Sequence, residues 1–236
     1  MMEKLLWDSL KYTVTNEHIE AIIKGLDLVP QDRVLAVGGS GDAAFAILEY
    51  AGKVIVVDYS PAQSKYIAQR ANFLKEMDLE AFLRVEKFGS KDYNLGDRDA
   101  KPSLERRNRY FLENGRLNKI RSRLENLEII EGDILGQAKL ANGVTKIYLS
   151  NAIGYPSHDY TESRNILNEL AQKLPQGGLI YVSNHDNLLK GGSSLQSEKT
   201  LDAYFLSPEL KLDIPLTVKA QEIEKDTWVP GVYRKI

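Results

Sequence analysis

Glycine and acidic residues stand at two turns where a nucleotide-binding sheet would need them. The run Gly38-Gly39-Ser40-Gly41 follows an apolar stretch at 33–37. Glycines at such a turn let ligand atoms approach the backbone, and the unpaired N–H groups of a following helix attract polar ligand atoms. Asp58 ends the next apolar stretch, about 20 residues beyond the first glycine, where a carboxylate reaches ribose hydroxyls. These residues predict a nucleotide site.

Two later turns extend this pattern. Asp133 and Ile134 follow the apolar stretch 127–130, where a carboxylate can accept from an adenine amino group and an isoleucine can lie against the ring. Asn151 and Tyr155 follow 144–150 and supply an amide donor and acceptor and an aromatic wall. Each turn alone could be a polar loop without chemistry. The prediction depends on all four turns falling at strand ends in this order.

Histidines provide the candidates for a general base. His158 and His185 follow the fourth and fifth apolar stretches, where a base could reach an acceptor. The chain has three histidines and no cysteine, and it lacks a His-x-x-x-His or Gly-x-Ser-x-Gly motif. We therefore expect no metal site and no serine or cysteine nucleophile.

The elements that must position these residues alternate between strand and helix. The predicted strands are 33–37, 53–58, 127–130, 144–150 and 178–183, and the predicted helices are 42–50, 61–77 and 160–173. Ser60 suits an N-cap and Pro61 the first helical position. This order predicts an α/β fold with a doubly wound, mostly parallel Rossmann-like sheet, in which ligands bind beyond the carboxyl ends of the strands.

The remaining segments are expected to complete one domain over residues 1–236. Helices are predicted at 3–11 and 16–28, within the N-terminal 1–30, and a helical insertion or lid at 78–123. The insertion carries Arg106, Arg107 and Arg109, which we interpret as the solvated basic face of an amphipathic helix, with an RNA-facing patch as the alternative. Segments 216–223 and 227–233 could add an antiparallel pair at one edge of the sheet.

Composition sets the broad class of the protein. Hydrophobic residues make up 43% and charged residues 27% of the chain, and the formal net charge is −2. This charge disfavours a broad grip on nucleic acid, so we expect a small-molecule acceptor. No apolar run is long enough to span a bilayer, and the first residues do not resemble a signal peptide, so the expected location is cytoplasmic. The sequence leaves a monomer and a homodimer both open.

Two nucleotide donors fit these turns. A glycine turn with an acid after the second strand also suits an NAD-dependent oxidoreductase. The acid after the third strand, the polar turn after the fourth and the possible antiparallel pair favour S-adenosylmethionine. A non-catalytic adenosine-nucleotide-binding module is a further alternative, disfavoured because the predicted pocket residues are all suited to their tasks.

Several segments also resemble one transferase family. They are Lys11-Tyr12-Thr13-Val14-Thr15-Asn16-Glu17, Gly38-Gly39-Ser40-Gly41-Asp42-Ala43, Val57-Asp58-Tyr59-Ser60-Pro61-Ala62-Gln63, Gly115-Arg116, Leu149-Ser150-Asn151, Asp226 and Tyr233. The chain resembles the diacylglycerol 3-amino-3-carboxypropyl transferases of betaine-lipid synthesis and their relatives. The resemblance implies a methyltransferase-like fold and transfer of the aminocarboxypropyl group, which leaves methylthioadenosine. It also implies a site at Asp58, Gln63, Asp133 and Asn151. Family members are longer and more basic, with Trp-Glu-Asp where this chain has Thr-Asn-Glu, which weakens the case for a lipid acceptor.

We therefore expect a transferase that moves a methyl or 3-amino-3-carboxypropyl group from S-adenosylmethionine to a small-molecule or lipid-like acceptor. The adenosine is expected along Gly39–Gly41, Asp58 and Asp133, and the reacting carbon near Asn151 and Tyr155. Tyr59 and Gln63 complete the predicted donor contacts. Residues expected to bind the acceptor or close over the site are Tyr12, Asn16, Glu17 and Arg116.

Overall fold

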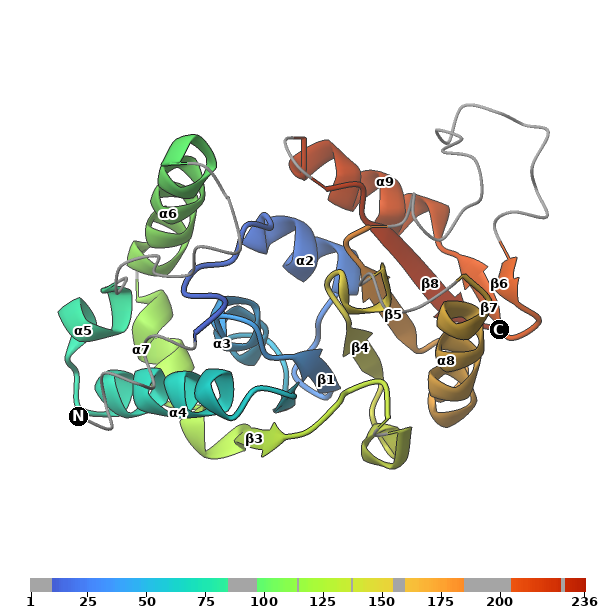
Figure 1. Ribbon diagram of the computed structural model, residues 1–236, viewed down its shortest axis with the longest axis horizontal. Coiled ribbons are helices and arrows are strands. Elements are labelled where there is room, and N and C mark those ends of the chain that lie inside the picture. The colour runs from blue at the N-terminus through green and yellow to red at the C-terminus, as the bar shows by residue number, and fades with distance from the viewer. Residues whose placement is uncertain are drawn as a thin grey trace.

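The computed structural model describes residues 10–84, 97–113, 115–136, 138–154, 160–184, 205–225 and 228–236. Five parallel strands form one side of its sheet (Figure 1). They are β1 (Arg33–Val37), β2 (Lys53–Asp58), β3 (Leu127–Glu131), β4 (Lys146–Tyr148) and β5 (Leu179–Val182). Their order is β3-β2-β1-β4-β5, so the chain reverses direction across the sheet between β1 and β4. This confirms the predicted doubly wound fold.

Three further strands extend the sheet beyond β5. β8 (Gly231–Lys235) pairs antiparallel with β5, β7 (Leu210–Leu212) with β8, and β6 (Phe205–Ser207) with β7. The prediction of an antiparallel addition is thus confirmed, but one of its two segments is wrong. Residues 216–223 belong to helix α9 (Ile214–Ile223), because the Asp213 side chain caps its start and a proline stands in its first turn.

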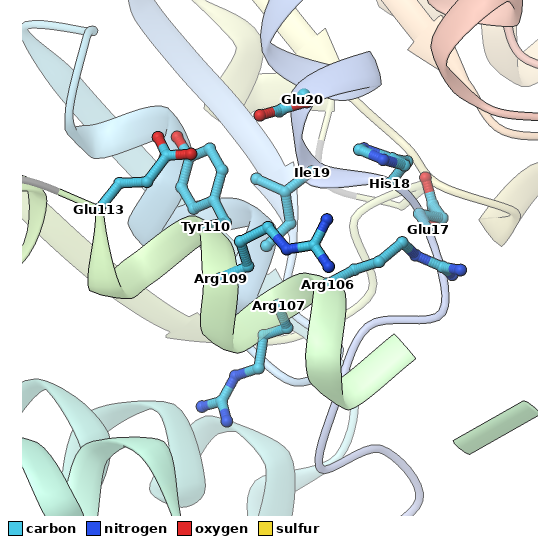
Figure 2. A pocket seen from close by; sticks show the side chains of 9 residues that line it. All are labelled: Glu17, His18, Ile19, Glu20, Arg106, Arg107, Arg109, Tyr110 and Glu113. Atoms are coloured by element: carbon cyan, nitrogen blue, oxygen red, sulfur yellow. The ribbon is translucent and has the colours of Figure 1, made fainter. Parts of the chain in front are cut away.

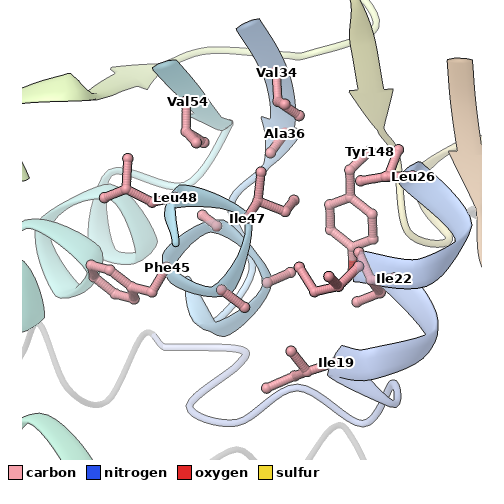
Figure 3. Close-up of a cluster of buried hydrophobic side chains, with 14 of the residues drawn as sticks. Ile19, Ile22, Leu26, Val34, Ala36, Phe45, Ile47, Leu48, Val54 and Tyr148 are labelled. Carbon is pink, nitrogen blue, oxygen red and sulfur yellow. The ribbon is translucent and has the colours of Figure 1, made fainter. Parts of the chain in front are cut away.

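Helices cover both faces of the sheet. On one face, α2 (Ile19–Leu26) packs against α9 and lies near α3 (Asp42–Leu48), as Figure 1 shows. Figure 3 shows how Ile22, Phe45 and Val34 from this layer and the sheet meet in one apolar cluster. On the other face, α8 (Tyr160–Lys173) contributes Leu167 and Leu170 to a second cluster with β4 and β5. The core therefore lies on both sides of the sheet.

Two predicted helix starts have different outcomes. Helix α4 (Pro61–Lys75) begins as predicted, since the Ser60 side chain accepts a hydrogen bond from the Gln63 N–H. Helix α2 begins only at Ile19, because His18 is extended, and residues 10–18 are irregular. The predicted helical start at Asn16 is therefore wrong. The predicted helix at 3–11 lies mostly outside the described residues.

The predicted insertion contains α5 (Leu79–Leu83), α6 (Asp97–Leu112) and α7 (Arg116–Arg121). Short 3-10 turns complete the fold at Leu124–Asn126, Ala138–Ala141 and Ala152–Gly154. Phe82 of α5, Phe111 of α6 and Ile120 of α7 share the cluster that contains α2 and α3. Among the described helices, none has the length and apolar character needed to cross a membrane.

Candidate functional site

The backbone of the glycine turn after β1 favours glycine. Gly39 and Gly41 have φ angles of +50° and +83°, in the left-handed region that side chains avoid. At Gly38, an added Cβ would lie 2.8 Å from Cβ and Oδ2 of Asp58. Ser40 is buried and donates from Oγ to Asp42 Oδ2 at 2.8 Å. The turn therefore brings its backbone against the end of β2 and leads directly into α3.

Asp58 holds this turn from the end of β2. Its Oδ2 accepts from the Gly39 N–H at 2.9 Å, and its Oδ1 accepts from the Ser60 N–H at 2.9 Å. Burial raises the pKa of the Asp58 carboxyl, although the two backbone hydrogen bonds act in the opposite direction. Each oxygen keeps one lone pair beyond these bonds, so the carboxylate can still accept from a ribose. The neighbouring Tyr59 is 57% exposed.

Gln63 fastens the N-terminal segment across the turn. Its Oε1 accepts from the N–H groups of Lys11 and Tyr12 at 2.9 and 3.2 Å. Its Nε2 donates to the carbonyls of Tyr12 at 2.8 Å and Gly39 at 2.6 Å. These four bonds use the whole amide of Gln63. Gln63, a predicted donor contact, thus positions the N-terminal segment against the glycine turn.

The turn after β3 lies beside Asp58. The Gly132 N–H donates to the Asp58 carbonyl at 2.8 Å, and Asp133, which follows, is exposed. Asp133 Oδ1 accepts from the Leu135 N–H at 3.0 Å, which leaves Oδ2 available. Ile134, the predicted contact of the adenine ring, is 4% exposed and belongs to the second apolar cluster.

Glu17 places a carboxylate at the ends of β4 and β5. Its Oε1 accepts from the hydroxyls of Tyr148, at 2.8 Å, and Ser150. Its Oε2 accepts from the hydroxyl of Ser183. Ser150 has a φ of +53°, a strained conformation for a residue with a side chain. Burial raises the pKa of Glu17 and the nearby carboxylate of Glu224 raises it further, while the three hydroxyl bonds partly offset this.

The predicted reacting end is only partly described. Asn151 is half-buried directly after Ser150, and no hydrogen bond of its side chain is recorded among the described residues. Tyr155, His158 and His185 lie outside the described residues, so their roles stay predictions. Tyr12 and Asn16 lie on the irregular segment that Gln63 and Asp42 hold against the glycine turn.

Asp42 forms a buried ion cluster that the sequence analysis missed. It has no exposed surface, and its Oδ1 lies 2.8 Å from Arg70 Nη1 and 3.0 Å from Arg107 Nε. Burial alone would raise the pKa of Asp42, but the two guanidinium groups lower it to about 2. Its Oδ2 accepts from the Thr15 N–H at 2.9 Å. The cluster ties α4, α6 and the N-terminal segment to the start of α3.

One expectation about the arginines in the insertion is wrong. Arg107 is 1% exposed rather than solvated, and it also donates to the carbonyls of Phe82 and Leu83. Arg116, the predicted partner of a substrate carboxylate, pairs with Glu113 at 2.7 Å and lies 3.4 Å from Glu49, and its role toward a substrate stays a prediction. Arg116 also lies 3.8 Å from the centre of the Tyr110 ring.

A pocket of about 110 Å³ adjoins Glu17 (Figure 2). It lies between the start of α2 and one face of α6. The lining residues are Glu17, His18, Ile19, Glu20, Arg106, Arg107, Arg109, Tyr110 and Glu113. In the described part of the chain, no three His, Cys, Asp or Glu side chains gather in a way that could hold a metal ion.

Comparison with known proteins gives matches at the level of structure. The chain matches no family model, and no curated protein matches it in sequence. It aligns with the N-methyltransferase NodS from Bradyrhizobium japonicum, solved with S-adenosyl-L-homocysteine, at a TM-score of 0.50 and 13% identity, over 92% of this chain and 85% of NodS. It aligns with TrmN from Thermus thermophilus at a TM-score of 0.52 and 14% identity, over 97% of this chain and 51% of TrmN. At such identities the likeness concerns the fold alone, and the chain has a methyltransferase-like Rossmann fold.

Proposed function

We propose that this protein is an S-adenosylmethionine-dependent transferase. The observation that carries the proposal is the adjacency of Gly39, Asp58 and Asp133 at the carboxyl ends of three neighbouring parallel strands. The glycine turn suits close approach of a ligand, and Asp58 retains lone pairs for ribose hydroxyls. Asp133 is exposed beside Asp58 and suits an adenine amino group.

The sheet order argues for this donor rather than NAD. The usual dinucleotide-binding sheet runs 3-2-1-4-5-6 with parallel strands. Here an antiparallel strand, β8, lies directly beside β5 and separates it from β7. The solved structure of NodS contains S-adenosyl-L-homocysteine, which supports the same type of donor on this fold.

The transfer requires the acceptor to lose a proton. When bound, the donor supplies a carbon next to a sulfonium, and attack by the acceptor breaks that C–S bond, whose electron pair stays on sulfur as a neutral thioether. Glu17 is the carboxylate at the ends of β4 and β5, next to Asn151, where we place the reacting carbon. Its Oε2 takes one hydroxyl donor and keeps one lone pair for the departing proton. Tyr148, Ser150 and Ser183 orient this carboxylate.

The transferred group determines which sulfur nucleoside is released. The resemblance to aminocarboxypropyl transferases favours methylthioadenosine, whereas methyl transfer would release S-adenosylhomocysteine. The antiparallel strands and the donor turns suit either reaction, because both are in-line displacements that depend on orientation and exclusion of water.

Donor binding tests the proposal directly. We expect S-adenosylhomocysteine and methylthioadenosine to raise the melting temperature and NAD to leave it unchanged, since ligand at 100 times its Kd adds about 2.7 kcal/mol. Asp133→Ala should weaken binding about tenfold, because it removes a charge-assisted hydrogen bond of roughly 1.5–3 kcal/mol. Asp58→Asn should weaken binding similarly. Titration calorimetry measures both.

Glu125→Gln is the matched control, because Glu125 is exposed at the opposite, amino end of β3. It should bind the sulfur nucleosides like the unmodified protein. Stabilisation by NAD alone would replace the transferase proposal with an oxidoreductase. Affinity within twofold of normal in both aspartate variants would show that the donor lies elsewhere.

A further inference from the structure

The irregular segment 11–17, here called the strap, runs along the carboxyl edge of the sheet and leads into α2 (Figure 1). Hydrogen bonds hold it at the end of β2, across the glycine turn after β1, and at the ends of β4 and β5. These four strands are neighbours, so the strap crosses three strand spacings, or about 14 Å. A stretch of this length spans at most about 20–25 Å when fully extended. The strap therefore has limited slack between its two ends.

The first end of the strap is fastened by Gln63, whose side chain is 1% exposed. Its Oε1 accepts from the N–H groups of Lys11 and Tyr12. Its Nε2 donates to the carbonyls of Tyr12 and Gly39. One buried side chain thereby ties the backbone of the strap to the backbone of the glycine turn. Leu10, which precedes the strap, packs in an apolar cluster with two buried residues of α4.

The middle of the strap is held by two further buried residues. The hydroxyl of Tyr66 donates to the Thr13 carbonyl at 3.1 Å, and Asp42 Oδ2 accepts from the Thr15 N–H at 2.9 Å. Thr15 Oγ1 in turn accepts from the N–H of Glu17 at 3.2 Å. A continuous series of bonds thus leads along the strap to Glu17.

The second end of the strap carries the Glu17 carboxylate, which is 5% exposed and accepts from three hydroxyls at the ends of β4 and β5. Its position therefore depends on where the strap ends. The titratable and charged groups around this carboxylate, besides the other charged residues of the pocket described above, are Tyr148, Tyr181, His18, Glu224, Arg106 and Arg109.

The first end of the strap lies beside open space at the glycine turn. A Cβ added at Gly39 would meet no atom within 4 Å, so there is room next to this backbone. The Lys11 ammonium donates to the Tyr59 hydroxyl at 2.6 Å and acts on the carboxylate of Asp58. A nucleoside bound along Gly39 and Asp58 therefore lies beside the strap.

We propose that Gln63 is a positioning residue that links the donor site, through the strap, to the carboxylate of Glu17. The inference rests on the proposed function, because it takes the glycine turn as the donor site and Glu17 as the group that receives the acceptor's proton. With Gln63 in place, the strap is fixed at both ends and Glu17 has one position. Without it, the first end is loose and the carboxylate is free to leave its three hydroxyls. Occupancy of the donor site and the state of Glu17 are then coupled, and such coupling is reciprocal.

The titration of Glu17 in the absence of any ligand is the first test. The protein is labelled with ¹³C at the glutamate Cδ positions, and the Glu17 signal is identified by its absence in Glu17→Gln. Gln63→Met keeps much of the side-chain volume but removes all four hydrogen bonds. Burial raises the pKa of Glu17 in the unmodified protein. We expect the midpoint in Gln63→Met to fall toward that of an ordinary glutamate, because a loosened strap exposes the carboxylate to water.

Gln69→Met is the matched control, since Gln69 lies two turns further along the same helix, and it should leave the Glu17 midpoint unchanged. Tyr66→Phe is a milder second variant, which keeps the ring and removes the hydroxyl that holds Thr13. It should lower the midpoint by a smaller amount, and it decides the question if Gln63→Met does not fold. An unchanged midpoint in Gln63→Met, or in Tyr66→Phe if it alone folds, would overturn the proposal.

Adenosine tests the link from the donor end. It has the base and ribose that we place at Gly39 and Asp58, but it lacks the sulfur substituents that we place near Glu17. At saturation, established by calorimetry, adenosine should move the Glu17 signal in the unmodified protein and in Gln69→Met. It should move the signal less or not at all in Gln63→Met. A signal that stays in place in the unmodified protein, or moves equally in all three proteins, would overturn the link.

S-adenosylhomocysteine binding to the unmodified protein separates this inference from the donor assignment. If the donor product binds and the Glu17 midpoint is the same in Gln63→Met, the transferase proposal stands and the role of Gln63 fails. If neither S-adenosylhomocysteine nor adenosine binds, the transferase proposal fails and so does the link to a donor. The ligand-free titration then still decides whether Gln63 positions Glu17.

Discussion

Two buried carboxylates near the glycine turn have pKa values shifted in opposite directions. Burial acts on both, but their partners differ. Asp42 faces two guanidinium groups, which lower its pKa to about 2. Burial raises the pKa of Glu17, the hydroxyls of Ser150, Ser183 and Tyr148 offset only part of this, and the nearby carboxylate of Glu224 raises the pKa further. Asp42 therefore contributes to stability as an anion, whereas the charged form of Glu17 is unfavourable in the folded state.

This difference makes Glu17→Gln a test of the charge at that position. A raised folded-state pKa gives stability that is present at low pH and lost as the pH rises through that pKa. The glutamine variant has no such group. We expect its melting temperature, relative to the unmodified protein, to rise as the pH increases above the ordinary pKa of a glutamate. Thermal unfolding at a series of pH values measures this.

Glu125→Gln, an exposed substitution, should give a curve parallel to that of the unmodified protein at each pH. If the Glu17→Gln curve also runs parallel, Glu17 does not carry a raised pKa. Its proposed capacity to receive a proton from the acceptor would then lose its support.

At the scale of elements, α6 shows what a helical pattern in the sequence can and cannot predict. The spacing of its residues identified an amphipathic helix, and Tyr110 and Phe111 are indeed buried. The pattern could not reveal that Arg107 belongs to the buried side, because its partner Asp42 is 65 residues away in sequence. A charged residue within a basic run gives no local sign of such a partner. Arg107 thus anchors α6 to the core through a position that the periodicity alone predicts to be exposed to solvent.

Replacing that arginine should loosen α6 from the glycine turn. Arg107→Met keeps much of the side-chain volume but removes one ion-pair partner of Asp42 and the donors to two carbonyls. We expect a loss of about 3 kcal/mol, or roughly 6–12 °C in melting temperature. Arg121→Met, an exposed change on α7, should stay within about 0.5 kcal/mol. Equal effects of the two substitutions would contradict the structural role given to Arg107.

At the scale of the whole molecule, the alternation of apolar stretches predicted the five parallel strands and their neighbouring helices. The glycine turn and Asp58 could be found because they occur directly after strands. The surroundings of Glu17 could not, since Tyr148 and Ser183 meet it only through the sheet order. The strand predicted at 216–223 is wrong because the apolar residues of this segment suit either a strand or a helix. The side chain of Asp213 caps the start of α9 and thereby stabilises the helix.

The predicted single domain has its own test. Side chains from α2, α6, α7 and α9 join one cluster with the sheet, so the insertion shares the main core. We expect one cooperative urea transition, with coincident curves from far-UV circular dichroism and tryptophan fluorescence. S-adenosylhomocysteine at 100 times its Kd should shift both curves together by about 2.7 kcal/mol. Two separated transitions would show that the chain does not unfold as one unit.

The sequence distances across Glu17 have a consequence for how the protein folds. Asp58 meets Gly39 across 19 residues, whereas Glu17 meets Ser150 and Ser183 across 133 and 166 residues. Closing the longer loops costs more chain entropy and slows formation of those contacts. During synthesis, the bond between Gly39 and Asp58 needs only the first part of the chain, but the carboxylate of Glu17 waits for β5 to be made. The donor turn therefore forms first, and the contacts of Glu17 form later.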